Sequence, residues 1–81
     1  AMMASAGFAR AIVPVFTPLD GDIVFAATTG HKELSDPVRD LAAIGAAAAA
    51  CVARSIARGV YEATALPFPG ALPCWQKRFG N

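Results

Sequence analysis

The sequence SDPVRDLAAIGAAAAACVARSIARGVYEA, residues 35–63, predicts one long helix, the main element of the fold. Ser35 or Asp36 can cap its first turn, and Pro37 suits the first helical position, where no backbone N–H donor is needed. Small and apolar residues recur at three- or four-residue spacing and form one stripe of Val38, Leu41, Gly45, Ala48, Val52, Ile56 and Gly59. Small side chains let a helix axis approach its neighbour closely. The sequence therefore predicts a helix over 36–63 that packs by this stripe.

Charged residues of this helix fall on the side opposite the stripe. Arg58 and Glu62 have the i, i+4 spacing of a helical ion pair. The longest uncharged run, residues 41–53, is shorter than the ~20 residues that a membrane span needs. We therefore expect the helix to lie against a sheet rather than in a membrane.

The residues before this helix predict a helix end and a strand. AMMASAGFARAI, residues 1–12, has helical spacing and stops before Pro14. No capping residue precedes it, so we expect this helix to begin upstream of Ala1. Residues 13–30 predict an extended loop followed by a strand, in which DIVFAATT, residues 22–29, is nearly all apolar, as in a strand covered on both faces.

Residues 64–81, TALPFPGALPCWQKRFGN, predict an irregular tail because prolines interrupt any helical or strand period. Its large apolar groups favour packing along a surface. The tail could contact a neighbouring subunit, or it could fold back over its own.

The composition is typical of part of a larger body. Of 81 residues, 56% are hydrophobic and 16% charged, and alanine supplies much of the apolar content. Alanine buries little area, so the chain gains little free energy from a core of its own. We interpret residues 1–81 as a partial single domain. A net charge of +1 without a basic stripe gives no reason to expect a nucleic-acid partner.

The two cysteines, Cys51 and Cys74, do not form a disulfide framework or a metal-binding spacing. Reduced thiols fit a cytoplasmic protein, and we expect neither a metal nor a cofactor. Cys74 is interpreted as a packing residue and His31 as a solvated turn residue.

Asp20-Gly21-Asp22 stands at the mouth of the expected strand. On a strand, residues at i and i+2 point to the same face, and two close carboxylates repel each other unless a cation lies between them. The pair could therefore orient an amine or act in acid/base chemistry. Asp-Gly is also a common turn dipeptide, and the acids could simply face water. Arg10 could brace Asp20 or stabilise the end of its own helix.

The order GFARAIVPVFTPLDGDIVFAATTG (residues 7–30), followed by the capped alanine-rich helix ending in ARSIARGVYEA, resembles the C-terminal portion of the L-aminopeptidase/D-esterase family. That family includes the β-peptidyl aminopeptidases and the nylon-oligomer (6-aminohexanoate oligomer) hydrolases. The specific part is residues 9–12, then Thr17-Pro18, then Asp20-Gly21-Asp22. The resemblance implies an α/β fold: a fragment of an αββα sandwich of the N-terminal-nucleophile hydrolase type.

In this family a precursor cleaves itself, and the Ser or Thr at the new N-terminus attacks amide bonds. The resemblance implies that Asp20 and Asp22 match the acidic pair that orients this nucleophile in the nylon-oligomer hydrolases. The aminopeptidase branch more often has Ser and Glu there. No Ser or Thr of this chain occupies the nucleophile position, so the segment by itself is expected to be inactive.

The implied partners are the remainder of the precursor, a small peptide or amide substrate, and further copies in a homo-oligomer. A second interpretation stays open: a non-catalytic assembly or interaction segment of a larger α/β protein, which uses the alanine-rich helix and the aromatic tail for contacts.

Overall fold

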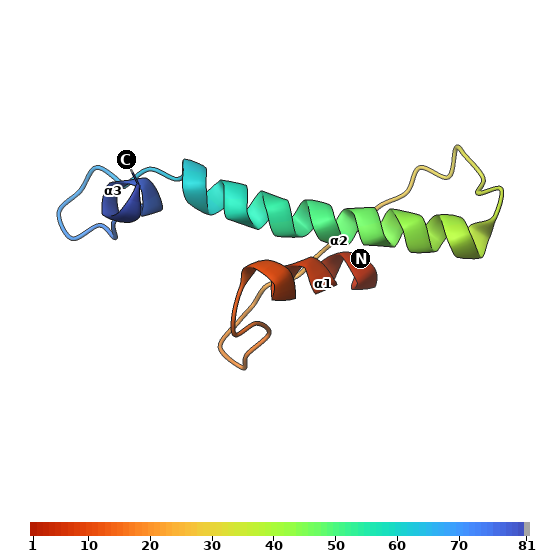
Figure 1. The fold of residues 1–81 in the computed structure, drawn as a ribbon, viewed down its shortest axis with the longest axis horizontal. Helices are drawn as coiled ribbons and strands as arrows, with labels where there is room; N and C mark the ends of the chain where they lie inside the picture. Colours follow the sequence, from red (N-terminus) through yellow and green to blue (C-terminus); the bar gives the residue numbers. More distant parts are fainter. Residues whose placement is uncertain (81) are drawn as a thin grey trace.

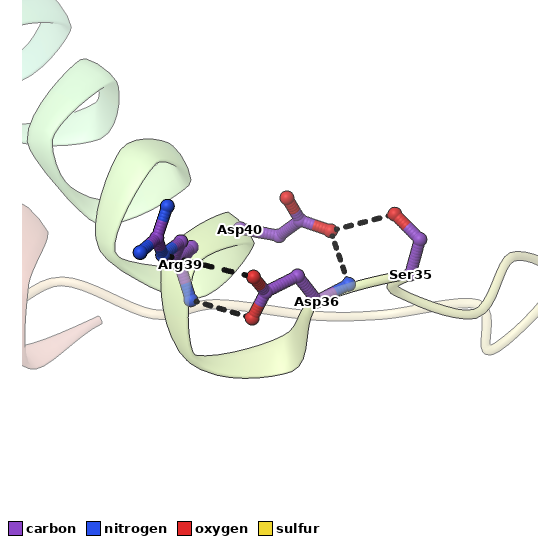
Figure 2. A network of polar contacts seen from close by, with 4 residues as sticks. All are labelled: Ser35, Asp36, Arg39 and Asp40. Atoms are coloured by element: carbon purple, nitrogen blue, oxygen red, sulfur yellow. Dashed lines mark hydrogen bonds and ion pairs between the residues drawn. The ribbon is translucent and has the colours of Figure 1, made fainter.

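The computed structural model describes residues 1–80, and its longest element is helix α2 (Pro37–Glu62) (Figure 1). Asp36 is the residue that caps it. One carboxylate oxygen of Asp36 accepts a hydrogen bond from the Arg39 amide at 3.4 Å, and the other lies 3.8 Å from Arg39 Nε (Figure 2). Asp40 Oδ2 accepts from the Asp36 amide at 3.1 Å and from Ser35 Oγ at 3.4 Å. The capped helix expected from the sequence is therefore present, with Pro37 in its first turn.

Helix α1 (Met2–Ala11) lies along the middle of α2 (Figure 1). The contact leaves no room for side chains at its centre. A Cβ on Gly7 would lie 2.8 Å from Val52 Cβ and nearer still to the carbonyl oxygen of Ala49. A Cβ on Gly45 would lie 2.6 Å from Met3 Cε. The residues of 1–80 that are buried are accordingly all small: Ala4, Gly7 and Gly45.

The predicted stripe on α2 is used only in part. Its middle turns face α1, where Gly45 is buried and Ala48, Val52 and Ile56 are half-buried. Its ends, Val38 and Gly59, are exposed. Since α1 has only 10 residues, it covers about 15 Å of α2 at a rise of ~1.5 Å per residue.

The strand expected over 22–29 is absent, since residues 1–80 contain helices and turns but no strand. Ile23 and Phe25 are 68% and 86% exposed, so residues 1–80 do not cover this segment. A strand needs a neighbouring extended segment to pair its N–H and C=O groups. The chain offers no such neighbour within its described part. Of the sandwich implied by the resemblance, residues 1–80 display helices alone.

The tail is more ordered than the sequence predicted. Ala71 N–H donates to Phe68 O at 3.2 Å across Pro69-Gly70, and Gly70 has φ +82°, as a type II turn requires. A short helix follows, α3 (Trp75–Phe79), which contacts the C-terminal end of α2 (Figure 1). The expectation of a tail without helix is therefore wrong at these five residues.

Two contacts fix α3 to α2. Gln76 Nε2 donates a hydrogen bond to the Tyr61 carbonyl at 2.6 Å, which satisfies one of the free acceptors at the helix end. The Tyr61 and Trp75 rings lie 5.7 Å apart, and Phe79 follows Trp75 at 6.0 Å. In this structure the tail folds back over its own chain.

The chain is extended for its size. Its radius of gyration is 16.7 Å, whereas a compact domain of this length has about 12 Å. It exposes 7039 Å², against about 4,600 Å² for a folded monomer of its mass. One helix pair and the docked α3 therefore hold these residues together, and most large apolar side chains stay uncovered.

Helix α2 is long and apolar enough to cross a membrane, as judged by length and composition alone. The uncharged run of residues 41–53 is shorter than this helix because it ends at the charged residues on either side. Core helices of large proteins share the same length and composition, and α2 already packs against α1 by one face. The absence of a membrane partner stays a prediction.

Candidate functional site

The loop between α1 and the extended segment carries the two acids singled out in the sequence. It projects away from both helices before the chain turns back (Figure 1). Residues 17–20 form a β-turn in which Asp20 N–H donates to Thr17 O at 3.0 Å. Asp20 Oδ2 accepts from the Thr17 amide at 2.8 Å, and the Leu19 amide donates to Thr17 Oγ1 at 3.3 Å. The Asp20 carboxylate is thus part of the turn that shapes the loop.

Asp22 has a different position. Its side chain is exposed and lines a shallow hollow of about 340 Å³ beside the first turns of α1, together with Phe16, Ser5 and Val24. Within residues 1–80 no hydrogen bond or ion pair engages its carboxylate. The shared strand face predicted for Asp20 and Asp22 does not form within residues 1–80, because they contain no strand. The predicted catalytic roles of Asp20 and Asp22 do not depend on a shared strand face, and they stay predictions.

Phe16 is the residue of this loop that the sequence reasoning missed. Its φ of +54° places it in the left-handed region, which side chains other than Gly rarely adopt. Its ring meets Phe8 of α1 edge-on, with centroids 5.6 Å apart and planes at 81°. The ring also lines the hollow that contains Asp22. No sequence signal marks a left-handed Phe, so only the structure could identify it.

The other candidates named from the sequence lie apart from this hollow. The ion pairs formed within the described residues are Arg39–Asp36 and Arg58–Glu62, so Arg10 does not brace Asp20. Arg10 instead lies in the last turn of α1, where a cation is favourable. The Arg58–Glu62 pair, at 3.2 Å, confirms the predicted spacing.

His31 is exposed in the loop before α2, Cys51 is exposed on α2, and Cys74 is half-buried next to α3. Thr28 Oγ1 accepts a hydrogen bond from Gly30 N–H at 3.1 Å, which is a local turn contact. No three His, Cys, Asp or Glu side chains gather in the part of the chain that the structure describes.

Comparison with known proteins identifies a peptidase family and several similar aminopeptidases. The family model of Peptidase family S58 matches residues 1–71. An uncharacterized aminopeptidase of Mycobacterium tuberculosis is 42% identical over 89 aligned positions, which cover 88% of this chain and 26% of the relative. An uncharacterized aminopeptidase of Mycobacterium leprae is 37% identical, with 88% and 25% covered. The chain thus spans about a quarter of the length of these curated relatives.

No solved structure gives a significant match. The family match covers α1, the acidic loop and α2, and it ends before α3. It confirms the resemblance predicted from residues 7–30 and the alanine-rich helix. The chain therefore belongs to peptidase family S58.

Proposed function

We propose that this chain is part of a self-processing amide hydrolase, an aminopeptidase or amide-oligomer hydrolase, in which Asp20 and Asp22 position a Ser or Thr nucleophile. Membership of a peptidase family and the aminopeptidase names of two relatives support the reaction class. Because the chain spans about a quarter of those relatives, the nucleophile is assigned to residues outside it.

The observation that carries the proposal is the environment of Asp22. Its carboxylate is exposed in a hollow and has no partner among residues 1–80. Asp20, two residues earlier, is held by the Thr17 turn. A fixed loop that presents an unpaired carboxylate suits an ammonium group, because an opposite charge within a few ångströms favours the charged forms of both.

The chemistry follows from an N-terminal Ser or Thr. Its hydroxyl oxygen attacks the amide carbonyl carbon while its own α-amine accepts the hydroxyl proton. Asp22 then lies beside the resulting ammonium and fixes its orientation. The proton passes to the leaving amine, the C–N bond breaks, and an ester to the nucleophile remains. Water hydrolyses that ester, releases the acid and restores the hydroxyl. These steps need neither a metal nor a cofactor.

The proposal includes the fold of the complete protein, an αββα sandwich. The exposed apolar segment 22–29 would become a strand once it pairs with a sheet supplied by the remaining residues of an αββα sandwich. A small peptide or amide substrate, a homo-oligomer and a cytoplasmic location complete the proposal. The exposed apolar side chains of Ile23 and Phe25 favour such pairing.

The test is Asp22→Asn in the complete gene product, with Glu33→Gln as the matched control. Glu33 is an exposed carboxylate in the loop before α2. Removal of one preorganised hydrogen-bonding group at a reacting centre lowers kcat by about 10²–10³. We expect the kcat of Asp22→Asn to fall by a similar factor, whereas Glu33→Gln should keep its turnover. Wild-type turnover by a folded Asp22→Asn enzyme would refute the proposal.

A second candidate function is a non-catalytic assembly segment. The breadth of uncovered apolar surface on α2 and the tail favours it, including exposed Leu41, Val60 and Leu72. It predicts a complete gene product that assembles but does not cleave amides, and whose assembly is lost when these side chains become polar.

A further inference from the structure

The backbone of Phe16 is held in a conformation that costs free energy. A non-Gly residue at φ +54° is strained, and residues kept in such regions gather at binding and catalytic sites. Here the edge-on contact with Phe8 holds the ring in place. Phe16 is still 51% exposed, so part of the residue is free for contact with another molecule.

Phe16 lines the same hollow as Asp22. The hollow is lined by Phe16 and by the apolar side chains of Met2, Ile23 and Val24. Its polar side chains are two: the Ser5 hydroxyl, which already donates to Met2 O at 2.6 Å, and the Asp22 carboxylate. The hollow therefore combines one negative charge with an apolar wall.

We propose that Phe16 is a specificity-determining residue, whose ring contacts the acyl-side group of the amide substrate. This inference rests on the proposed function. If Asp22 holds the nucleophile's amine, the acyl group bonded to the nucleophile lies close to the hollow that Asp22 and Phe16 both line. Aliphatic or aromatic acyl groups gain from burial against the ring, whereas acidic acyl groups are repelled by Asp22.

The test compares leucyl and alanyl p-nitroanilides as substrates of the complete gene product. The ratio of their kcat/KM values measures the apolar wall, and it is independent of the fraction of enzyme that folds. Phe16→Ala should lower the leucyl-to-alanyl ratio about tenfold, the lower end of the discrimination that an apolar pocket gives for one methylene group. Phe16→Leu restores part of the wall and should recover part of the ratio. Phe25→Ala is the control, because Phe25 lines a different hollow, beside Leu41 and Ile44.

An unchanged leucyl-to-alanyl ratio in Phe16→Ala would overturn the inference, as would an equal fall of the ratio in Phe25→Ala. The outcome is separable from that of the proposed function. If Asp22→Asn loses turnover while the Phe16→Ala ratio stays constant, the nucleophile assignment survives and the specificity role does not. If Asp22→Asn keeps turnover, both fail.

Discussion

Asp20 Oδ2 accepts a hydrogen bond from the backbone N–H of Thr17 at 2.8 Å, and Asp20 N–H returns one to Thr17 O at 3.0 Å. This reciprocal contact closes the turn immediately before Asp22. The two acids of the Asp-Gly-Asp motif therefore differ in their surroundings: the first is engaged by the backbone, and the second has no partner within residues 1–80. The difference gives each acid its own test.

Asp20→Asn should reduce turnover less than Asp22→Asn does. Asparagine keeps a carbonyl oxygen that can accept from the Thr17 amide, so the turn survives. Asp20→Ala removes the acceptor and should lower turnover more than Asp20→Asn. Steady-state kinetics of the three variants in the complete gene product check this order. Equal losses in Asp20→Asn and Asp20→Ala would mean that the charge of Asp20 matters and its turn contact does not.

Gly7→Ala should destabilise the protein. A Cβ at Gly7 would lie 2.8 Å from Val52 Cβ and closer still to the Ala49 carbonyl oxygen. Neither atom can rotate away. Overpacking of this kind costs about 1–3 kcal/mol. Gly45→Ala meets the flexible end of the Met3 side chain and also Met3 Cβ at 2.9 Å, so it should destabilise the protein too, but by less than Gly7→Ala because none of the contacts at Gly45 is with backbone. Thermal unfolding midpoints of the two variants give the comparison.

The control for both glycine variants is Gly59→Ala, where a Cβ meets nothing within 4 Å in this chain. Alanine is the better helix former by about 1 kcal/mol, so this variant should unfold at the wild-type temperature or above it. A Gly7→Ala protein as stable as Gly59→Ala would contradict the close α1–α2 contact.

Asp36→Ala should lower the free energy of unfolding by about 1 kcal/mol, the usual value of an N-terminal helix cap. The cap contact is the Arg39 amide at 3.4 Å, supported by the Arg39 side chain (Figure 2). Asp36→Asn keeps an acceptor and should recover most of the loss. Ser35→Ala loses only a 3.4 Å contact to Asp40 and should change stability by less than about 0.5 kcal/mol. Denaturant unfolding measures the free energy of unfolding of all three variants. A larger loss for Ser35→Ala than for Asp36→Ala would show that Asp36 is not the helix cap.

Trp75→Ala should release the tail from α2. Its ring packs on Tyr61 at 5.7 Å, and the neighbouring Gln76 caps the Tyr61 carbonyl. Once the tail is released, trypsin should cut the peptide bonds after Lys77 and Arg78 faster. Mass spectrometry of timed digests detects this change. Leu72→Ala is the control because Leu72 is exposed and outside these contacts. Identical digestion of Trp75→Ala and the wild type would show that α3 does not protect the tail.

The helices could be predicted from the sequence because their signals are local. Asp36 and Pro37 mark the start of α2, and small residues at helical spacing mark the face that packs on α1. The helix α3 was missed because three prolines between 67 and 73 suggested irregular backbone throughout, whereas the tertiary contacts of Trp75 and Gln76 stabilise a short turn of helix. The strand at 22–29 was expected from its apolar run alone, but pairing depends on residues that this chain does not supply.

The candidate site was predictable only as residue types. Asp20 and Asp22 were identified by their spacing, but the turn contact of Asp20 depends on Thr17, which the sequence reasoning did not connect to it. The left-handed Phe16 has no sequence signature, because its conformation is imposed by the loop and by packing against Phe8.

The most direct measurement is the intact mass of the purified complete gene product, combined with sequencing of each N-terminus. We expect two chains, with these 81 residues within the smaller one and a Ser or Thr at that chain's first position. A single uncleaved chain that hydrolyses amides at full rate would refute self-processing and the N-terminal nucleophile.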